Sequence, residues 1–196
     1  MKRMALVLAA AVMVTACKKT EPDASVVEMA PEPGSVPWKI QNARSAAPAS
    51  ISAGARVRER MNPDTAWGAV LAQGDSTWTC IADDPNTQAN DPYCIDGEGA
   101  RFVEAWRAQR PPRLSGMGIA YILQGSASAS DTDPFKTMPD SGQQWLVDPP
   151  HIGIAMPNAR SYAGLPTRRR TDGPWVKFAG TPYAYIIIPS SRPAAP

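Results

Sequence analysis

Short apolar stretches separated by proline and glycine turns run through the chain from residue 55 onward, a pattern that predicts β-strands. The clearest strand is expected over 116–125, where large apolar residues alternate with mostly small ones. A second strand of this kind is expected over 151–157. The run at 183–189 is apolar at nearly every position, which predicts a strand buried on both faces and central in its sheet. Shorter strands are expected over 55–61, 67–72, 78–81 and 173–178.

One amphipathic helix stands out from these strands. Asp96 is a suitable N-cap, and Phe102, Val103 and Trp106 follow at helical spacing before two prolines end the pattern after about residue 109. A short second helical segment is expected near 158–163. These elements predict an α+β fold with a mostly antiparallel sheet of about five to seven strands and one clear amphipathic helix.

Two of the predicted strands carry small residues on one face. Gly118 and Ala120 share a face in the first strand, and Gly153 and Ala155 share a face in the second. Such faces allow a neighbouring group to approach the backbone closely, and the group can be a helix or a ligand. Helix packing is the commoner reason.

The first sixteen residues form a separate segment. Lys2 and Arg3 precede ten apolar residues, which are too few for a spanning helix of ~20 residues but suit a secretory signal peptide. Its last three residues and the residue that follows read Val-Thr-Ala-Cys17, which resembles the lipobox of bacterial lipoproteins. An ordinary cleaved signal with an incidental cysteine is the alternative interpretation.

The lipobox resemblance implies lipidation, including palmitate, at Cys17 after removal of residues 1–16. An anchor with several acyl chains holds a protein stably at a membrane. The residue after the cysteine is Lys18 rather than Asp, which resembles an outer-membrane address in Gram-negative lipoproteins. We therefore expect a lipid-anchored cell-envelope protein at the outer membrane that faces the periplasm, with the membrane as a partner through its lipid.

Residues 17–47 are rich in proline, charge and small side chains, which predicts a disordered tether. A single domain is expected over 48–196. Trp38 and Ile40 interrupt the polar pattern of the tether. They either dock on the domain, which is the commoner case, or bind a partner.

Charge and cysteine content narrow the classes of function. Without Lys2 and Arg3 the 20 basic residues fall to 18 (20 − 2 = 18), which equals the 18 acidic ones, so no strongly basic surface for nucleic acid is expected. If Cys17 is lipidated, Cys80 and Cys94 remain as a pair that can form a disulfide in an oxidising compartment. A metal site at these cysteines is the weaker alternative, because no second nearby cysteine or histidine pair accompanies them.

The segment 126–150 is the strongest candidate for a functional site. It is long, rich in Ser, Asp and Pro, and poor in apolar residues, and structureless segments of this length are usually functional or disordered. It ends at His151, which is the only histidine of the chain. His151 with Asp131 or Asp133 and a loop serine could form a Ser-His-Asp arrangement, although a G-x-S-x-G motif is missing.

A second resemblance covers residues 48–189. Several short motifs together resemble an uncharacterised family of bacterial exported proteins with no assigned activity, and the resemblance therefore implies no catalytic residue. The motifs are Trp78-Thr-Cys80, Asp91-Pro-Tyr-Cys94, Gly118-Ile-Ala-Tyr-Ile-Leu-Gln-Gly125, Asp131-Thr-Asp-Pro-Phe135, Pro149-Pro-His-Ile152, Gly173-Pro-Trp-Val176 and Gly180-Thr-Pro-Tyr-Ala184.

These patterns favour a non-catalytic envelope module that binds a small ligand or another envelope protein, with no cofactor. The first alternative is a small hydrolase that uses His151 with Asp131 or Asp133. The second is a metal-binding envelope protein, either through His151 with Met117 and Met156 for copper or through the acidic segment 82–93 for calcium. The spacing of that acidic segment does not match a calcium-binding loop of the EF-hand type.

Overall fold

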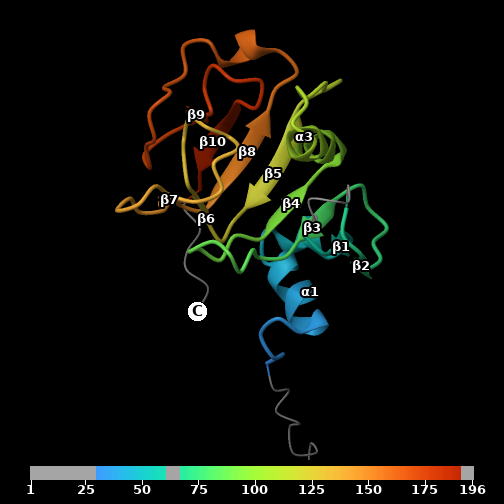
Figure 1. Cartoon of the computed structure of the whole chain (residues 1–196). Helices are drawn as coiled ribbons and strands as arrows, with labels where there is room; N and C mark the ends of the chain where they lie inside the picture. The colour runs from blue at the N-terminus through green and yellow to red at the C-terminus, as the bar shows by residue number, and fades with distance from the viewer. Residues whose placement is uncertain (1–29, 61–66, 191–196) are drawn as a thin grey trace, which may run out of the picture. The chain divides into compact units, whose positions relative to one another are not determined.

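The computed structural model describes residues 30–60 and 67–190, and one folded unit begins at Pro31. An eight-stranded sheet organises this unit in the order β2-β1-β3-β4-β5-β8-β10-β9 (Figure 1). Neighbouring strands are antiparallel, apart from the parallel pair β1 and β3. The strands are β1 (Arg56–Arg58), β2 (Val70–Ala72), β3 (Thr79–Ile81), β4 (Tyr93–Ile95), β5 (Gly118–Ile122), β8 (His151–Ala155), β9 (Trp175–Lys177) and β10 (Tyr185–Pro189).

The predicted α+β class and the mostly antiparallel sheet are confirmed, but the predicted strand number is too low. In the eight-stranded sheet the prediction missed β4, whose three residues follow a turn-rich segment and are too few to show an alternating pattern. The predicted central position of the 183–189 strand is also wrong. β10 lies one strand from the edge, where β8 and β9 pair with its two sides.

The strand register separates the residues into two faces. Ile95, Ala120, Gly153, Ile187 and Trp175 lie opposite one another across five strands and therefore share one face. The helix α3 (Gly97–Arg107) packs on this face, because its Phe102 contacts Ala155 and Tyr185. The helix α1 (Val36–Arg44) packs on the opposite face over β1, β3 and β4.

The first helix corrects the predicted boundary between tether and domain. α1 begins after the N-cap Ser35, whose side chain accepts a hydrogen bond from the Trp38 amide, and Pro37 in its first turn suits a helix start. Ala43 and Ala46 are fully buried, and Ile40 packs beside them, which confirms the docking interpretation for Ile40. Composition placed these residues in the tether because proline and alanine are common in both settings.

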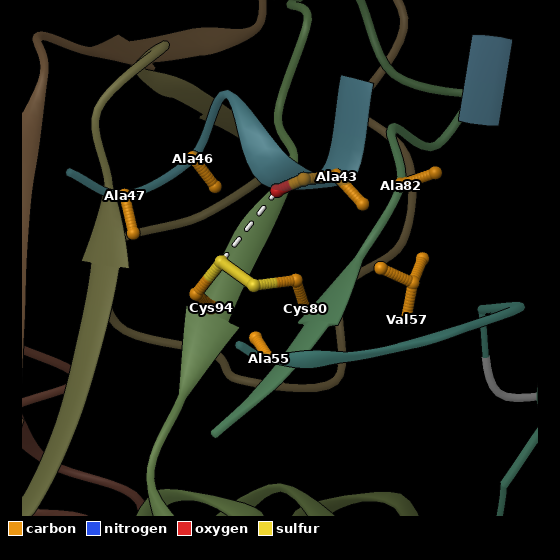
Figure 2. Close-up of a cluster of buried hydrophobic side chains, with 8 residues drawn as sticks. All are labelled: Ala43, Ala46, Ala47, Ala55, Val57, Cys80, Ala82 and Cys94. Carbon is orange, nitrogen blue, oxygen red and sulfur yellow. Dashed lines mark hydrogen bonds between the residues drawn. A yellow bond between two sulfur atoms is a disulfide. The ribbon is translucent and has the colours of Figure 1, made fainter. Parts of the chain in front are cut away.

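The helix α1 covers the cysteine pair. Cys80 and Cys94 lie opposite each other on β3 and β4, and their sulfur atoms are 1.99 Å apart, at the predicted disulfide distance. Figure 2 shows Ala43, Ala46 and Ala47 on one side of this pair, with Val57 and Ala55 close by. Trp78, which lies two residues before Cys80, packs against the same cluster.

The helix α3 forms as predicted and explains part of the small-residue pattern. The Asp96 carboxylate caps it by accepting a hydrogen bond from the Gly99 amide at 2.7 Å. A Cβ atom added to Gly118 would lie 2.8 Å from the Gly99 amide nitrogen, so only glycine permits this close approach of helix and strand. Helix packing therefore accounts for Gly118.

The segment 126–150 contains a hairpin rather than a structureless loop. Its strands β6 (Ser126–Ser128) and β7 (Leu146–Asp148) pair antiparallel, with Ala127 opposite Val147. The hairpin lies over the same sheet face as α3, because Ser128 and Asp148 both bind Lys177 on β9. The sequence hides it because serine and alanine have little strand character of their own.

Two short helical segments complete the fold. α2 (Ala49–Ser52) follows α1, and the 3₁₀-helix η1 (Ala159–Tyr162) lies at the predicted short helical segment. Within residues 30–60 and 67–190, no helix is both long enough and apolar enough to cross a membrane. The predicted signal peptide, Cys17 and Lys18 lie outside the described residues.

Candidate functional site

A cavity of about 590 Å³ lies on the sheet face that carries α3 and the β6–β7 hairpin. Its small-residue floor consists of Gly118 and Ala120 on β5 with Gly153 and Ala155 on β8. A Cβ atom added to Gly153 would meet its nearest neighbours only at 3.5 Å, which is ordinary contact. The small residues of β8 therefore leave room above the sheet between the helix and the hairpin.

Aromatic side chains form one wall of the cavity. This aromatic wall consists of Phe102 and Trp106 on α3, with Phe178 and Tyr185 beside them. Trp106 and Phe178 have ring centroids 5.4 Å apart, and Phe102 and Tyr185 are 6.1 Å apart, both in edge-to-face geometry. Phe178 has a φ of 54°, and its amide donates a 2.8 Å hydrogen bond to the Asp131 carbonyl oxygen, which holds this unusual backbone.

The hairpin supplies a wall of different chemistry. Ser126, Ser128 and Ser130 all line the cavity, as do the two alanines between them. The loop between β6 and β7 contributes Trp145 and Met138, and Met138 is 61% exposed. An exposed methionine at the cavity provides an apolar approach from solvent.

A buried ionic cluster ties the hairpin to β9. It consists of Asp131, Asp148, Arg169 and Lys177. Lys177 is only 2% exposed, and its Nζ donates 2.7 Å hydrogen bonds to Ser128 Oγ and to Asp148 Oδ2. The same Nζ lies 3.3 Å from Asp131 Oδ1. Lys177 Nζ therefore has two carboxylates and one hydroxyl group as close neighbours.

Arg169 completes the cluster from outside. Its Nε and Nη2 donate to both oxygens of Asp131 at 3.0 and 2.7 Å, and its Nη1 lies 3.0 Å from Asp148 Oδ1. Burial by itself would raise the pKa of Asp131, but the hydrogen bond from Arg169 and the charge of Lys177 outweigh it and lower the pKa. The cluster therefore contains two cations and two anions that neutralise one another.

His151 lies at the start of β8 and lines the cavity. Its Nδ1 is 2.7 Å from the Pro149 carbonyl oxygen, and the residue is 1% exposed. Burial lowers its pKa, and the nearby cations Lys177 and Arg169 add to this effect, while the hydrogen bond to Pro149 and the charge of Asp148 oppose it. The imidazole is therefore neutral near pH 7.

The far end of the cavity holds a second polar group. Asp91 accepts hydrogen bonds from Arg60 Nη2 at 2.9 Å, from the Asp84 amide at 3.1 Å and from Thr87 Oγ1 at 2.9 Å. Burial nevertheless raises the pKa of Asp91 to about 6, against the opposing effect of these donors. The Arg60 guanidinium lies 5.5 Å from the centre of the Tyr93 ring, and burial also raises the pKa of Tyr93.

The predicted catalytic candidates share one region but do not form a triad in this structure. His151 and Asp133 both line the cavity. The His151 ring is oriented by a backbone carbonyl, Asp131 is bound to Arg169, and Asp133 Oδ1 accepts from the Phe135 amide at 2.9 Å. Neither aspartate therefore orients the imidazole.

The predicted copper ligands lie apart. His151 pairs with Ile122 at one end of β5, whereas Met117 precedes Gly118 at the other end, beside Ala155 and Met156. Five residues of strand separate these ends, which corresponds to about 16 Å. Among the described residues, no three His, Cys, Asp or Glu side chains converge as a possible metal site.

Sequence reasoning missed the buried cation of the site. Lys177 belongs to the predicted strand 173–178, where it stands between the apolar Val176 and Phe178. Alternation places it on the same face as Trp175, which is fully buried. A lysine flanked in this way is the signal that could have revealed a buried ion pair, but its partners Asp131 and Asp148 are distant in sequence.

The fold and the cavity define this chain as an α+β protein with a partly open cavity of the size that small-molecule sites have, about 300–1,000 Å³. No protein-family model, no curated protein and no solved structure matches the chain.

Proposed function

We propose that this protein is a lipid-anchored cell-envelope module that binds a small, largely apolar molecule in the cavity between α3 and the β6–β7 hairpin. The proposal includes no catalytic step. One observation carries it: the cavity of about 590 Å³ combines an aromatic wall and a small-residue floor with polar groups at both ends. Pockets with this composition bury most of the surface of a ligand, while a few polar groups set its orientation.

The polar groups of the cavity support binding rather than catalysis. Lys177 Nζ already contacts three oxygen atoms, two of which belong to carboxylates, so these structural contacts occupy it. Ser128 Oγ accepts a hydrogen bond from this lysine, which does not activate the hydroxyl group as a nucleophile. The three carboxylates of Asp91, Asp131 and Asp148 are likewise held by arginine or lysine.

Filling the cavity tests this proposal directly. In Gly153→Leu the new side chain extends from the floor into the cavity, because a Cβ atom there has ordinary contacts only. Gly116→Leu is the matched control, since a Cβ atom at Gly116 has no neighbour within 4 Å and this residue does not line the cavity. The full chain would be purified from its host, and bound small molecules would be identified by native mass spectrometry.

We expect wild type and Gly116→Leu to carry the same small molecule, and Gly153→Leu to have lost it while its unfolding transition remains cooperative. Retention of the molecule by Gly153→Leu would exclude the cavity as its site. Failure of wild type both to carry a molecule and to be stabilised by any member of a small-molecule library would refute the proposed function.

The anchoring part of the proposal is supported by the lipobox resemblance at Cys17 and by the cysteine pair at disulfide distance, which suits an oxidising compartment. Cys17→Ala removes the acylation site. We expect wild type in the detergent-soluble membrane fraction and the variant in the soluble fraction. A wild-type protein that is soluble and keeps its initial methionine would contradict this part alone.

A hydrolase remains the second candidate, and one observation favours it. The neutral His151 lines a cavity that also exposes serine hydroxyl groups. A panel of ester, amide and glycan substrates separates the two candidates. Turnover by wild type that His151→Gln abolishes would establish the enzyme, whereas ligand binding without turnover supports the binding module.

A further inference from the structure

The His151 imidazole presents a hydrogen-bond acceptor that no protein group uses. A carbonyl oxygen only accepts hydrogen bonds, so the 2.7 Å contact with Pro149 requires the proton to be on Nδ1. In the neutral ring, Nε2 then carries a lone pair and no proton. Within the described residues, Nε2 has no hydrogen-bond partner, although the residue is 1% exposed and lines the cavity.

Since the residue lines the cavity, a molecule that occupies the cavity can supply the hydrogen-bond donor that Nε2 lacks among the described residues. The imidazole stays in this orientation, because its Nδ1 is held by the Pro149 carbonyl. A ligand that brings an O–H or N–H group to Nε2 would satisfy this acceptor. The first requirement on the ligand is therefore a hydrogen-bond donor.

The hairpin provides a complementary group near this position. Ser126 lines the cavity and lies opposite Asp148, three residues before His151, and its hydroxyl makes no hydrogen bond within the described residues. A serine hydroxyl both donates and accepts. A ligand hydroxyl matches this pair of groups, because it can donate to Nε2 and accept from Ser126 Oγ.

Three cations that line the cavity are each paired with a carboxylate, which disfavours an anionic ligand. Lys177 is paired with Asp131 and Asp148, and Arg60 is paired with Asp91. Lys136, which also lines the cavity, is paired with Asp140. An anionic ligand would have to displace one of these carboxylates and lose its own hydration, which an uncharged ligand avoids.

We propose that the cavity selects an uncharged, hydroxyl-bearing ring compound whose O–H donates to His151 Nε2 while its ring packs against the aromatic wall. This inference rests on the proposed function and specifies its ligand class. His151 would act as the residue that recognises the hydroxyl group, and the edge-to-face arrangement of Trp106 with Phe178 favours a ring as the apolar part.

A matched pair of probes tests this inference on the full chain. 4-Butylphenol carries the hydroxyl group, and 4-butyltoluene replaces it with a methyl group of similar size. By calorimetry we expect the phenol to bind wild type about tenfold more tightly, the effect of one ordinary hydrogen bond. The preference should disappear in His151→Phe, and both probes should lose binding in Gly153→Leu but not in Gly116→Leu.

A second readout does not depend on the folding of a variant. The chain has one histidine, so ¹⁵N-labelled histidine gives one imidazole in the spectrum. We expect the free protein to show a protonated Nδ1 and a proton-free Nε2, and the Nε2 resonance alone to shift when the phenol is added. 4-Butyltoluene should leave it in place.

The outcomes separate this inference from the proposed function. Equal binding of both probes, with sensitivity to Gly153→Leu but no shift of Nε2, would overturn the role of His151 and leave the binding cavity standing. Failure of the phenol to bind a wild-type protein that binds other compounds in the cavity would overturn the ligand class. Failure of every compound to bind the cavity would refute both.

Discussion

Removal of the buried ammonium of Lys177 should destabilise the protein by about 3 kcal/mol. Lys177→Met keeps an unbranched side chain of similar length but leaves the carboxylate of Asp148, whose side chain is fully buried, without its 2.7 Å partner. Loss of one member of a buried ion pair typically costs about 3–5 kcal/mol. We expect the lower end, because Arg169 remains 3.0 Å from the other oxygen of Asp148.

Urea unfolding followed by tryptophan fluorescence measures this loss. Lys136→Met is the matched control: its partner Asp140 is 73% exposed, so we expect a change within about 0.5 kcal/mol. The double variant Lys177→Met/Asp148→Asn removes both charges and should recover at least about 1 kcal/mol of the loss. A loss below about 1 kcal/mol for the single variant, or a double variant no more stable than the single, would refute the reasoning.

Three further predictions concern stability. Burial raises the pKa of Asp91 from 3.8 to about 6, so protonation of this carboxyl group stabilises the folded state. This contribution to the free energy of unfolding is fully present below pH 3.8 and is lost as the pH rises through 6. Asp91→Asn should therefore gain up to about 3 kcal/mol relative to wild type between pH 4 and pH 7.5, and an unchanged difference across this range in urea titrations would contradict it. Gly118→Ala should lower the free energy of unfolding by about 1–3 kcal/mol, because its Cβ would lie 2.8 Å from a backbone nitrogen. The control Gly116→Ala should change it by no more than about 0.5 kcal/mol. Equal midpoints of thermal unfolding for the two variants would argue against this close contact. Cys80→Ala/Cys94→Ala removes a cross-link between residues 14 positions apart and should lower the free energy of unfolding by about 3 kcal/mol. Reduction of the wild-type protein should reproduce that loss. A variant as stable as the oxidised protein would show that the pair is not bonded in solution.

Much of the fold follows from local patterns in the sequence. Asp96 and the spacing of Phe102 and Trp106 predicted α3 within two residues of its observed end, because caps and helical periodicity act over one or two turns. The alternation in β5 and β8 was predicted in the same way. The cysteine pair followed from the number of cysteines, since only Cys80 and Cys94 remain when Cys17 is set aside.

Elements without a local pattern could not be found in this way. β4, β6 and β7 have three residues each, and their strand character comes from pairing with distant partners rather than from their own side chains. α1 has a weak apolar stripe and consists partly of proline and small residues, so its stability comes from burying Ala43 against β3 and β4. Composition alone placed it in the tether.

The sequence by itself determined the class of fold and the main helix, because strand alternation and helical periodicity depend on neighbours along the chain. It determined the cysteine pairing by the number of cysteines, and it marked the segment that ends at His151 as a candidate site. Only the tertiary structure decided what surrounds that histidine. Asp131, Asp148, Arg169 and Lys177 meet because the hairpin folds over β9, and this contact is long-range. The same packing explains why the small residues of β8 border a cavity, since whether a helix or open space lies above a glycine depends on elements elsewhere in the chain.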